Sequence, residues 1–212
     1  MKKCIKIFLI ILLVCIIGSV IVLIIRNNNK LSIEEIKSLL DKGKSISNVY
    51  FEHTVLEQNE EEYTMKKYLK DDTYVFEIDN SYQWINFSTD EWIYIDNTNK
   101  TISVTDTKNC YKFNDYSYYF EELSNNGYEY KYIKLENVNQ ADYHVIEIKK
   151  EDVGKVKFWI NCENGVVEKK EEYNSLGNLV STNKYKYIYN IVTEEEIKKP
   201  DFLEYEEYKI LK

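Results

Sequence analysis

Hydrophobic and polar residues alternate with a period of two along most of the chain, a pattern typical of β-strands with one buried face. Short turns rich in Asp, Asn and Ser separate the alternating runs, which favours an antiparallel meander over alternating strands and helices. The pattern predicts about eleven strands. They cover residues 49–57, 62–70, 73–78, 82–87, 91–95, 101–105, 128–135, 143–149, 155–161, 165–173 and 180–191.

Two segments follow the helical period instead, residues 31–43 and 114–126. In the first, Ser32 and Glu35 match a capping box, and Gly43 is suited to end a helix. Its apolar residues share one face: Ile33, Ile36, Leu39 and Leu40. A long twisted sheet curls. The expected architecture is therefore a strongly curved antiparallel half-barrel with helices covering its concave face.

The chain begins with an apolar run over residues 7–25, which follows three lysines. As a helix this run would be roughly 28 Å long, close to the ~30 Å hydrocarbon core of a bilayer. The basic residues before it predict an uncleaved signal anchor with a cytoplasmic N-terminus. Signal-peptide cleavage and lipidation at Cys15 are the alternatives, although Val14 replaces the small residue expected before a lipidated cysteine.

The predicted fold class is thus α+β, with two parts. Residues 1–30 are expected to form a cytoplasmic stub, a transmembrane helix and a linker, and residues 31–212 an extracytoplasmic domain. The whole chain has a net charge of −8, but the first 30 residues carry five basic and no acidic side chains. The remaining 23 basic and 36 acidic residues give the predicted domain a net charge of −13. Such a domain is repelled by nucleic acid, so we expect no nucleic-acid partner.

Catalytic, metal and cofactor chemistry finds little support in the sequence. The 6 glycines form no phosphate-binding loop, and no G-x-S-x-G or H-E-x-x-H motif accompanies the two histidines. We therefore expect no enzyme, no cofactor and no metal site. His53 and His144 each lie on an apolar strand face, either as hydrogen-bonded core residues or as a pair that senses pH. Cys110 and Cys162 either form a disulfide in an oxidising compartment or stay free thiols.

Candidate site residues come from the inward face of each strand and from the second helix. The concavity candidates are Phe51, His53, Met65, Phe76, Trp84, Trp92, His144, Ile146, Phe158 and Ile160. The lid candidates are Tyr116, Tyr119, Phe120 and Leu123. These side chains either fill a core against the helices or leave part of the face open to an acyl chain.

In the segment from residue 155 to residue 191, Trp159, Ile160 and Asn161 are followed by a turn at Gly165, and residues 171–180 have the pattern of a further hairpin. This strand–turn–strand run and the hairpin after it resemble those of the LolA-like superfamily of bacterial envelope proteins. Weaker similarity extends over residues 31–205. It includes Asp90-Glu91-Trp92-Ile93-Tyr94 and Asp201-Phe202.

The resemblance implies an unclosed barrel with an apolar concavity under a helical lid, and a binding function without catalysis. The family includes lipoprotein carriers and clostridial spore-germination lipoproteins. The carriers have an arginine in the concavity, whereas this chain has no arginine after Arg26. The composition, rich in Lys, Asn, Ile and Tyr, is typical of a low-GC Gram-positive organism without an outer membrane.

Two functions follow as hypotheses. The first is a membrane-tethered extracytoplasmic module that binds a lipid, a lipoprotein acyl chain or another apolar ligand in the concavity. The second is a ligand-free module of the same fold that docks or steadies a partner protein of the envelope or of spore germination. A dry, unfilled pocket favours the first, and a filled core with an exposed apolar edge favours the second.

Overall fold

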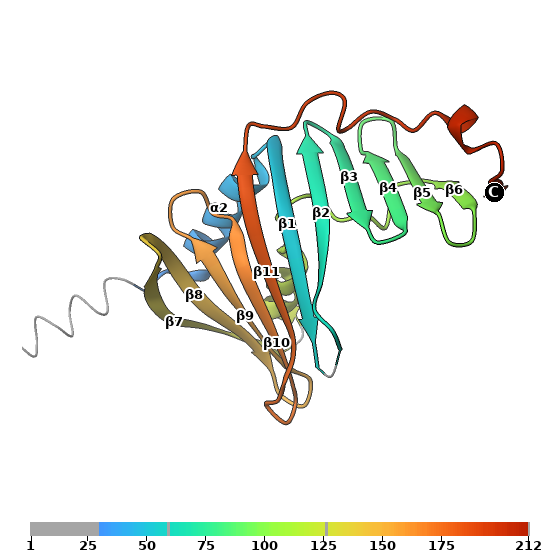
Figure 1. The fold of residues 1–212 in the computed structure, drawn as a ribbon. Coiled ribbons are helices and arrows are strands. Elements are labelled where there is room, and N and C mark those ends of the chain that lie inside the picture. The colour runs from blue at the N-terminus through green and yellow to red at the C-terminus, as the bar shows by residue number, and fades with distance from the viewer. Residues whose placement is uncertain (1–29, 59, 126, 212) are drawn as a thin grey trace, which may run out of the picture.

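A single sheet of twelve strands dominates the computed structural model, which describes residues 30–58, 60–125 and 127–211 (Figure 1). Its strand order is β12-β6-β5-β4-β3-β2-β1-β11-β10-β9-β8-β7. The first six strands are β1 (Asn48–Glu57), β2 (Tyr63–Lys70), β3 (Thr73–Ile78), β4 (Ser81–Asn86), β5 (Glu91–Asp96) and β6 (Thr101–Thr105). The others are β7 (Tyr128–Val138), β8 (Ala141–Lys150), β9 (Gly154–Asn161), β10 (Val167–Asn174), β11 (Leu179–Tyr189) and β12 (Lys209–Leu211).

The sheet consists of two antiparallel meanders that meet along one seam. Strands β1–β6 form one meander and β7–β11 the other, each joined by short turns. They join where β1 pairs with β11, from Val49 opposite Tyr189 to Glu57 opposite Ser181. The seam therefore places residues 124 to 140 positions apart in the sequence side by side at the middle of the sheet.

Two α-helices lie on one face of the sheet, α2 (Ile33–Lys44) and α3 (Ser117–Asn125). Helix α2 begins with the predicted capping box, since Glu35 N donates to Ser32 Oγ over 3.2 Å and Ser32 N donates to Glu35 Oε2 over 2.8 Å. Gly43 does not end this helix. It is buried in the last turn, where a Cβ atom would lie 2.6 Å from the carbonyl oxygen of Gly165.

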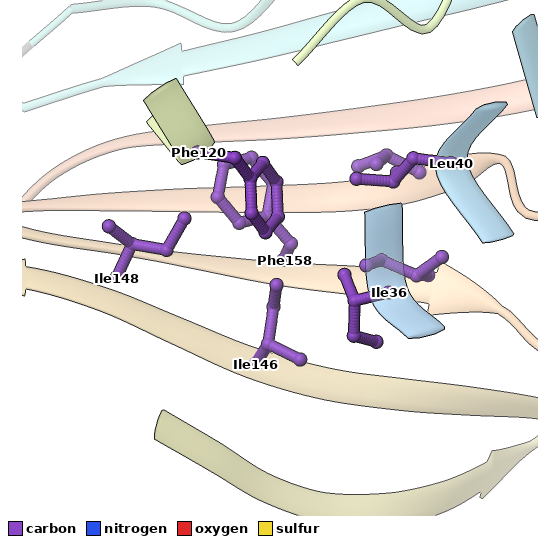
Figure 2. Close-up of a cluster of buried hydrophobic side chains, with 8 residues drawn as sticks. Ile36, Leu40, Phe120, Ile146, Ile148 and Phe158 are labelled. Carbon is purple, nitrogen blue, oxygen red and sulfur yellow. The ribbon is translucent and has the colours of Figure 1, made fainter. Parts of the chain in front are cut away.

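The helices pack over strands β8, β9 and β10. Ile36 and Leu40 of α2 and Phe120 of α3 point into a cluster of buried apolar residues (Figure 2). The strand side of this cluster is formed by Ile146, Ile148, Phe158, Ile160 and Val167. Since these strand side chains are at most 1% exposed, the helices seal this part of the sheet completely.

The C-terminal segment runs back past the ends of β1–β6 after β11 and covers the opposite face of the sheet over β3–β6 (Figure 1). Ile197, Phe202 and Tyr205 pack on a buried cluster from β3–β6, and residues Phe202–Tyr205 form the 3-10 helix η1. The segment ends as β12, which pairs in parallel with β6. The C-terminal residues are thus part of the fold.

The predicted fold class is wrong. The described chain is mostly an open sheet of twelve strands with two short α-helices, and these cover only part of one face. The twelfth strand was not predicted. Among the described residues, no helix is long and apolar enough to cross a membrane. The predicted transmembrane segment, residues 7–25 with Cys15, lies outside the described residues.

Candidate ligand-binding pocket

A cavity of about 420 Å³ lies between the sheet and the segment that leads into α3. Its floor comes from four neighbouring strands: Phe51 of β1, Lys67 of β2, Tyr74 and Phe76 of β3, and Tyr185 and Tyr187 of β11. The roof is formed by residues of the 111–119 segment, and Lys170 of β10 closes one side. Tyr111 and Lys112 are exposed, so they form the rim of the cavity. The volume lies within the range of small-molecule sites.

The walls of the pocket are mainly aromatic and are locked by mutual packing. The ring of Phe51 lies 5.3 Å from that of Tyr187 and 5.5 Å from that of Phe113. Tyr185 stacks on Tyr187 with a centroid separation of 6.1 Å. Rings packed at these separations attract one another. The surface that a ligand would touch is therefore largely formed before binding.

Asn114 fixes the roof of the pocket to the rest of the fold. Its backbone is left-handed (φ 53°), and its side chain is buried. Its Nδ2 donates to the carbonyl oxygens of Leu40 (3.1 Å) and Gly165 (3.0 Å), while its Oδ1 accepts from Val167 N (3.0 Å). The neighbouring Phe113 N donates to the Tyr74 hydroxyl. One side chain thus ties the roof to both α2 and the start of β10.

A hydrogen-bonded chain of three side chains runs beside the floor of the pocket. Lys67 Nζ lies 2.9 Å from His53 Nδ1, and His53 Nε2 lies 2.8 Å from Asn183 Oδ1. Because lysine can only donate, Nδ1 is the acceptor and Nε2 carries the ring proton. His53 is 9% exposed. Burial, reinforced by the positive charge of Lys67, lowers the pKa of His53 to about 3, so the imidazole is neutral at pH 7.

Lys67 carries a positive charge into the pocket without a carboxylate beside it. Its Nζ lies 5.0 Å from the ring centroid of Phe76 and 5.7 Å from that of Phe51. Burial, with Lys170 adding to it, lowers the pKa of Lys67 to about 8, so the amine stays mostly protonated at pH 7. Within the described residues, Lys67 forms no ion pair.

The other charged groups inside the pocket are balanced. Lys170 forms a 2.6 Å ion pair with Glu172, and Asp115 forms a 2.9 Å ion pair with Lys44. Lys112 is exposed to water at the rim, with its Nζ 5.3 Å from the ring centroid of Phe87. The pocket therefore has a net positive charge, although the chain as a whole has a net charge of −8.

The structure brings part of the predicted concavity set to this pocket. Phe51 and Phe76 line it. His53 is hydrogen-bonded to Lys67, which lines it as well. Met65 lies opposite His53 on the same face of the sheet. Trp92 also faces this side, farther out on β5, and its Nε1 is buried without a hydrogen-bond partner among the described residues.

Trp84 lies on the other face of the sheet. It belongs to the cluster under the C-terminal segment, and its Nε1 donates to the carbonyl oxygen of Ile197 over 2.8 Å. The prediction that Trp84 lines the concavity is therefore corrected: Trp84 lies on the opposite face of the sheet. The neighbouring residue Ile85 is the one that faces the pocket side, in a cluster with Tyr74.

The remaining concavity candidates lie under the helices, away from the pocket. Ile146, Phe158 and Ile160 are core residues covered by α2 and α3 (Figure 2). His144 is on β8, four strands away from β1, and its Nδ1 lies 3.1 Å from the Tyr132 hydroxyl. The two histidines therefore do not meet. Over the described residues, no cluster of three or more His, Cys, Asp or Glu side chains is arranged to hold a metal ion.

The lid candidates divide between pocket and core. Tyr116 and Tyr119 line the pocket, whereas Phe120 is buried in the core and Leu123 packs against it. Cys110 and Cys162 are both free thiols, so the disulfide left open by the sequence is not formed. Lys67 was missed by the sequence analysis, although it alternates with Met65 and Leu69 on the inward face of its strand.

Comparison with known proteins gives similarity in structure only. No family model and no curated protein matches the sequence. An uncharacterized conserved protein from Thermus thermophilus superposes with a TM-score of 0.59 at 10% identity, over 85% of this chain and 99% of that one. MucB in complex with MucA(peri) superposes with a TM-score of 0.51 at 10% identity, over 80% of this chain and 60% of that chain.

A LolA superfamily protein from Nitrosomonas europaea matches at 14% identity with a TM-score of 0.33, over 77% of this chain and 97% of that one. A LolA superfamily protein is thus among the similar solved structures, as the sequence resemblance predicts, and the likeness concerns the fold alone. At these sequence identities the comparisons show similarity of fold alone. The ligand or partner of this chain has to be inferred from its own pocket.

Proposed function

We propose that this protein is a non-catalytic extracytoplasmic module that binds a lipid or another largely apolar ligand in the pocket between β1–β3, β11 and the 111–119 segment. The observation that carries this proposal is the cavity of about 420 Å³ with aromatic walls. An aromatic-lined hollow of this size leaves room for the body of a small apolar ligand.

The location of the pocket supports the proposal. The helices close the sheet over β8–β10, and the C-terminal segment closes the other face over β3–β6. Over β1–β3 and β11, the described residues that roof the pocket belong to the 111–119 segment, which is held in place through Asn114.

Native mass spectrometry of the full-length protein tests the proposal. We expect an added mass that organic extraction removes, and we expect the delipidated protein to take up a fluorescent fatty acid with one-to-one stoichiometry. The substitution Tyr187→Trp on the floor should fill part of the cavity and weaken uptake at least tenfold. Ile188→Trp serves as its matched control, since Ile188 is the next residue of β11 and is 42% exposed. Absence of both bound lipid and uptake would rule the proposal out.

A second candidate function is binding of a protein partner along the free edge of β7. Among the strands of the described residues, β7 pairs with β8 alone, and its eleven residues include the exposed Ile133, Leu135 and Val138. Such an edge can accept a strand from another chain. The solved complex of MucB with MucA(peri) shows that a protein of similar fold binds a partner.

The two candidates can be separated by one substitution. Leu135→Pro removes a backbone donor from β7 and disfavours strand addition. It should abolish partner binding if the edge is the site, while fatty-acid uptake stays unchanged. Loss of fatty-acid uptake in this variant, with the fold intact, would place the ligand elsewhere than in the proposed pocket.

A further inference from the structure

Lys67 is the feature of the pocket that an apolar ligand alone does not explain. A neutral side chain such as methionine would suit a pocket for an uncharged lipid, and Met65 already lies two residues away on the same face. Instead, the wall contains an ammonium group whose pKa is lowered by burial. Burying a charge without a partner is costly. The cost implies a role for the charge when the pocket is filled.

The contacts of Lys67 show that its charge remains available. Its hydrogen bond goes to a neutral imidazole nitrogen, which leaves two ammonium protons for other acceptors. The Phe51 and Phe76 rings attract the cation weakly and at long range, with centroids 5.7 and 5.0 Å away. None of these partners neutralises the charge. An anion entering the pocket would be the first group to do so.

The surroundings of Lys67 divide the pocket into two kinds of surface. Lys170 lies close enough to act on the charges of both Lys67 and His53. Lys112 adds a positive charge at the exposed rim, whereas the charge of Lys170 is balanced by Glu172. The rings of Tyr74, Tyr185 and Tyr187 supply the apolar remainder. A ligand that satisfies both surfaces has one negatively charged end and an apolar body.

We propose that the pocket selects amphiphiles with a single anionic head, a carboxylate or a phosphate, that binds Lys67, while the apolar body lies on the aromatic floor. This inference rests on the proposed function and adds the chemical class of the ligand. The overall negative charge of the chain would repel such molecules from the surface. Lys67 therefore provides attraction at the one place where an anion is to be held.

Isothermal titration of the full-length protein with probes of one chain length tests this proposal. The probes are dodecanoate, dodecyl phosphate and the neutral dodecanamide, all below their micellar concentrations, and inorganic phosphate. At pH 7 we expect both anionic amphiphiles to bind at least tenfold more tightly than dodecanamide. Inorganic phosphate should bind at least a hundredfold more weakly than dodecyl phosphate, because it lacks the apolar body.

Substitution of Lys67 tests whether this residue causes the preference for the anionic probes over dodecanamide. In Lys67→Met, the affinity for dodecanamide should persist and the preference for the anions should fall below twofold. Lys67→Gln is the second variant, should the methionine alter the packing. Lys66→Met is the matched control, since Lys66 is exposed on the opposite face of the same strand. It should keep the full preference.

Each contrary outcome has a distinct meaning. Equal binding of dodecanamide and dodecanoate by the wild type would overturn the anionic selectivity while the proposed function stands. Equal binding of inorganic phosphate and dodecyl phosphate would overturn the amphiphile and leave a simple anion site. Retention of the tenfold preference in both Lys67 variants would overturn the role of Lys67. Binding of no probe at all would overturn the proposed function together with this inference.

Discussion

Lys67 donates a hydrogen bond to Nδ1 of His53 over 2.9 Å, although both side chains can carry a positive charge. The contact exists because burial keeps the imidazole neutral, with its Nε2 proton directed to Asn183. A protonated His53 would have no acceptor for Lys67 and would repel it. The pair thus holds the ammonium group in the pocket only while the histidine stays uncharged.

Removing the charge of Lys67 should stabilise the protein. The lowered pKa means that the folded state disfavours the protonated amine relative to the unfolded chain. Lys67→Met removes this cost but also the hydrogen bond to His53. We expect the free energy of unfolding at pH 7 to rise by roughly 1–2 kcal/mol, measured by urea denaturation. Lys66→Met should change it by less than about 0.5 kcal/mol. A Lys67→Met protein less stable than the wild type would contradict the interpretation of Lys67 as a charge held at a cost.

Lowering the pH should decrease the free energy of unfolding, because the folded state disfavours protonation of His53. The folded-state pKa of about 3 lies below the ordinary value of 6.5, so the unfolded chain binds a proton that the folded chain does not. The stability is therefore fully present above about pH 6.5 and falls by up to roughly 1.4 kcal/mol per pH unit as the pH drops from there towards 3. In His53→Gln this part of the slope should disappear.

The histidine contribution is measured as the difference between the wild type and His53→Gln in urea denaturation at pH 7, 5.5 and 4.5. His144, whose pKa is also lowered by burial, is present in both proteins and cancels. Parallel stability curves for the two proteins over this range would show that His53 titrates normally in the folded state.

Loss of the Asn114 side chain should loosen the roof of the pocket. Asn114→Ala removes three buried hydrogen bonds and leaves the amide of Val167 without its acceptor. We expect a loss of roughly 2–4 kcal/mol in the free energy of unfolding. Asn139→Ala is the control for the left-handed backbone alone, because Asn139 has φ 51° and is exposed. If the two variants lose equal stability, the side-chain bonds of Asn114 contribute nothing.

Gly165 should tolerate no side chain, because α2 passes directly over it. A Cβ atom there would lie 1.8 Å from the carbonyl oxygen of Leu39, and the backbone has φ +75°. Gly165→Ala is expected to cost more than about 3 kcal/mol, or to prevent folding. Gly177→Ala shares the backbone strain at φ +83° but has nothing within 4 Å, so about 1 kcal/mol is expected in thermal denaturation. A similar melting temperature for both variants would show that the helix can move away.

The periodicity of the sequence was sufficient to locate the strands and the first helix, but it could not assign a face to every strand. The turn between β3 and β4 has two residues, so Ile78 pairs with Ser81 and the inward positions change from even to odd numbers. Trp84 consequently faces outward and Ile85 inward. Both faces of β4 are apolar, so the pattern alone offered no means to detect the change.

The C-terminal segment and the pocket could not be predicted from the sequence, for a different reason. Strand β12 is three residues long and pairs in parallel with β6 through a long connection, which leaves no local pattern to read. The pocket depends on which strands become neighbours across the β1–β11 seam. Tyr185 and Tyr187 alternate along β11, but nothing near them in the sequence indicates that Lys67 lies across the seam.

The seam between β1 and β11 also bears on the order in which the protein acquires its structure. Each meander can form from local contacts, whereas the seam requires closure of a loop of 124 to 140 residues, which is a slow step. The floor of the pocket draws on both sides of the seam, from Phe51 and Lys67 to Tyr185 and Tyr187. A bound ligand would therefore bridge the two meanders and lower the population of states in which they are apart. Filling of the pocket would then report that the pairing of β1 with β11 is complete.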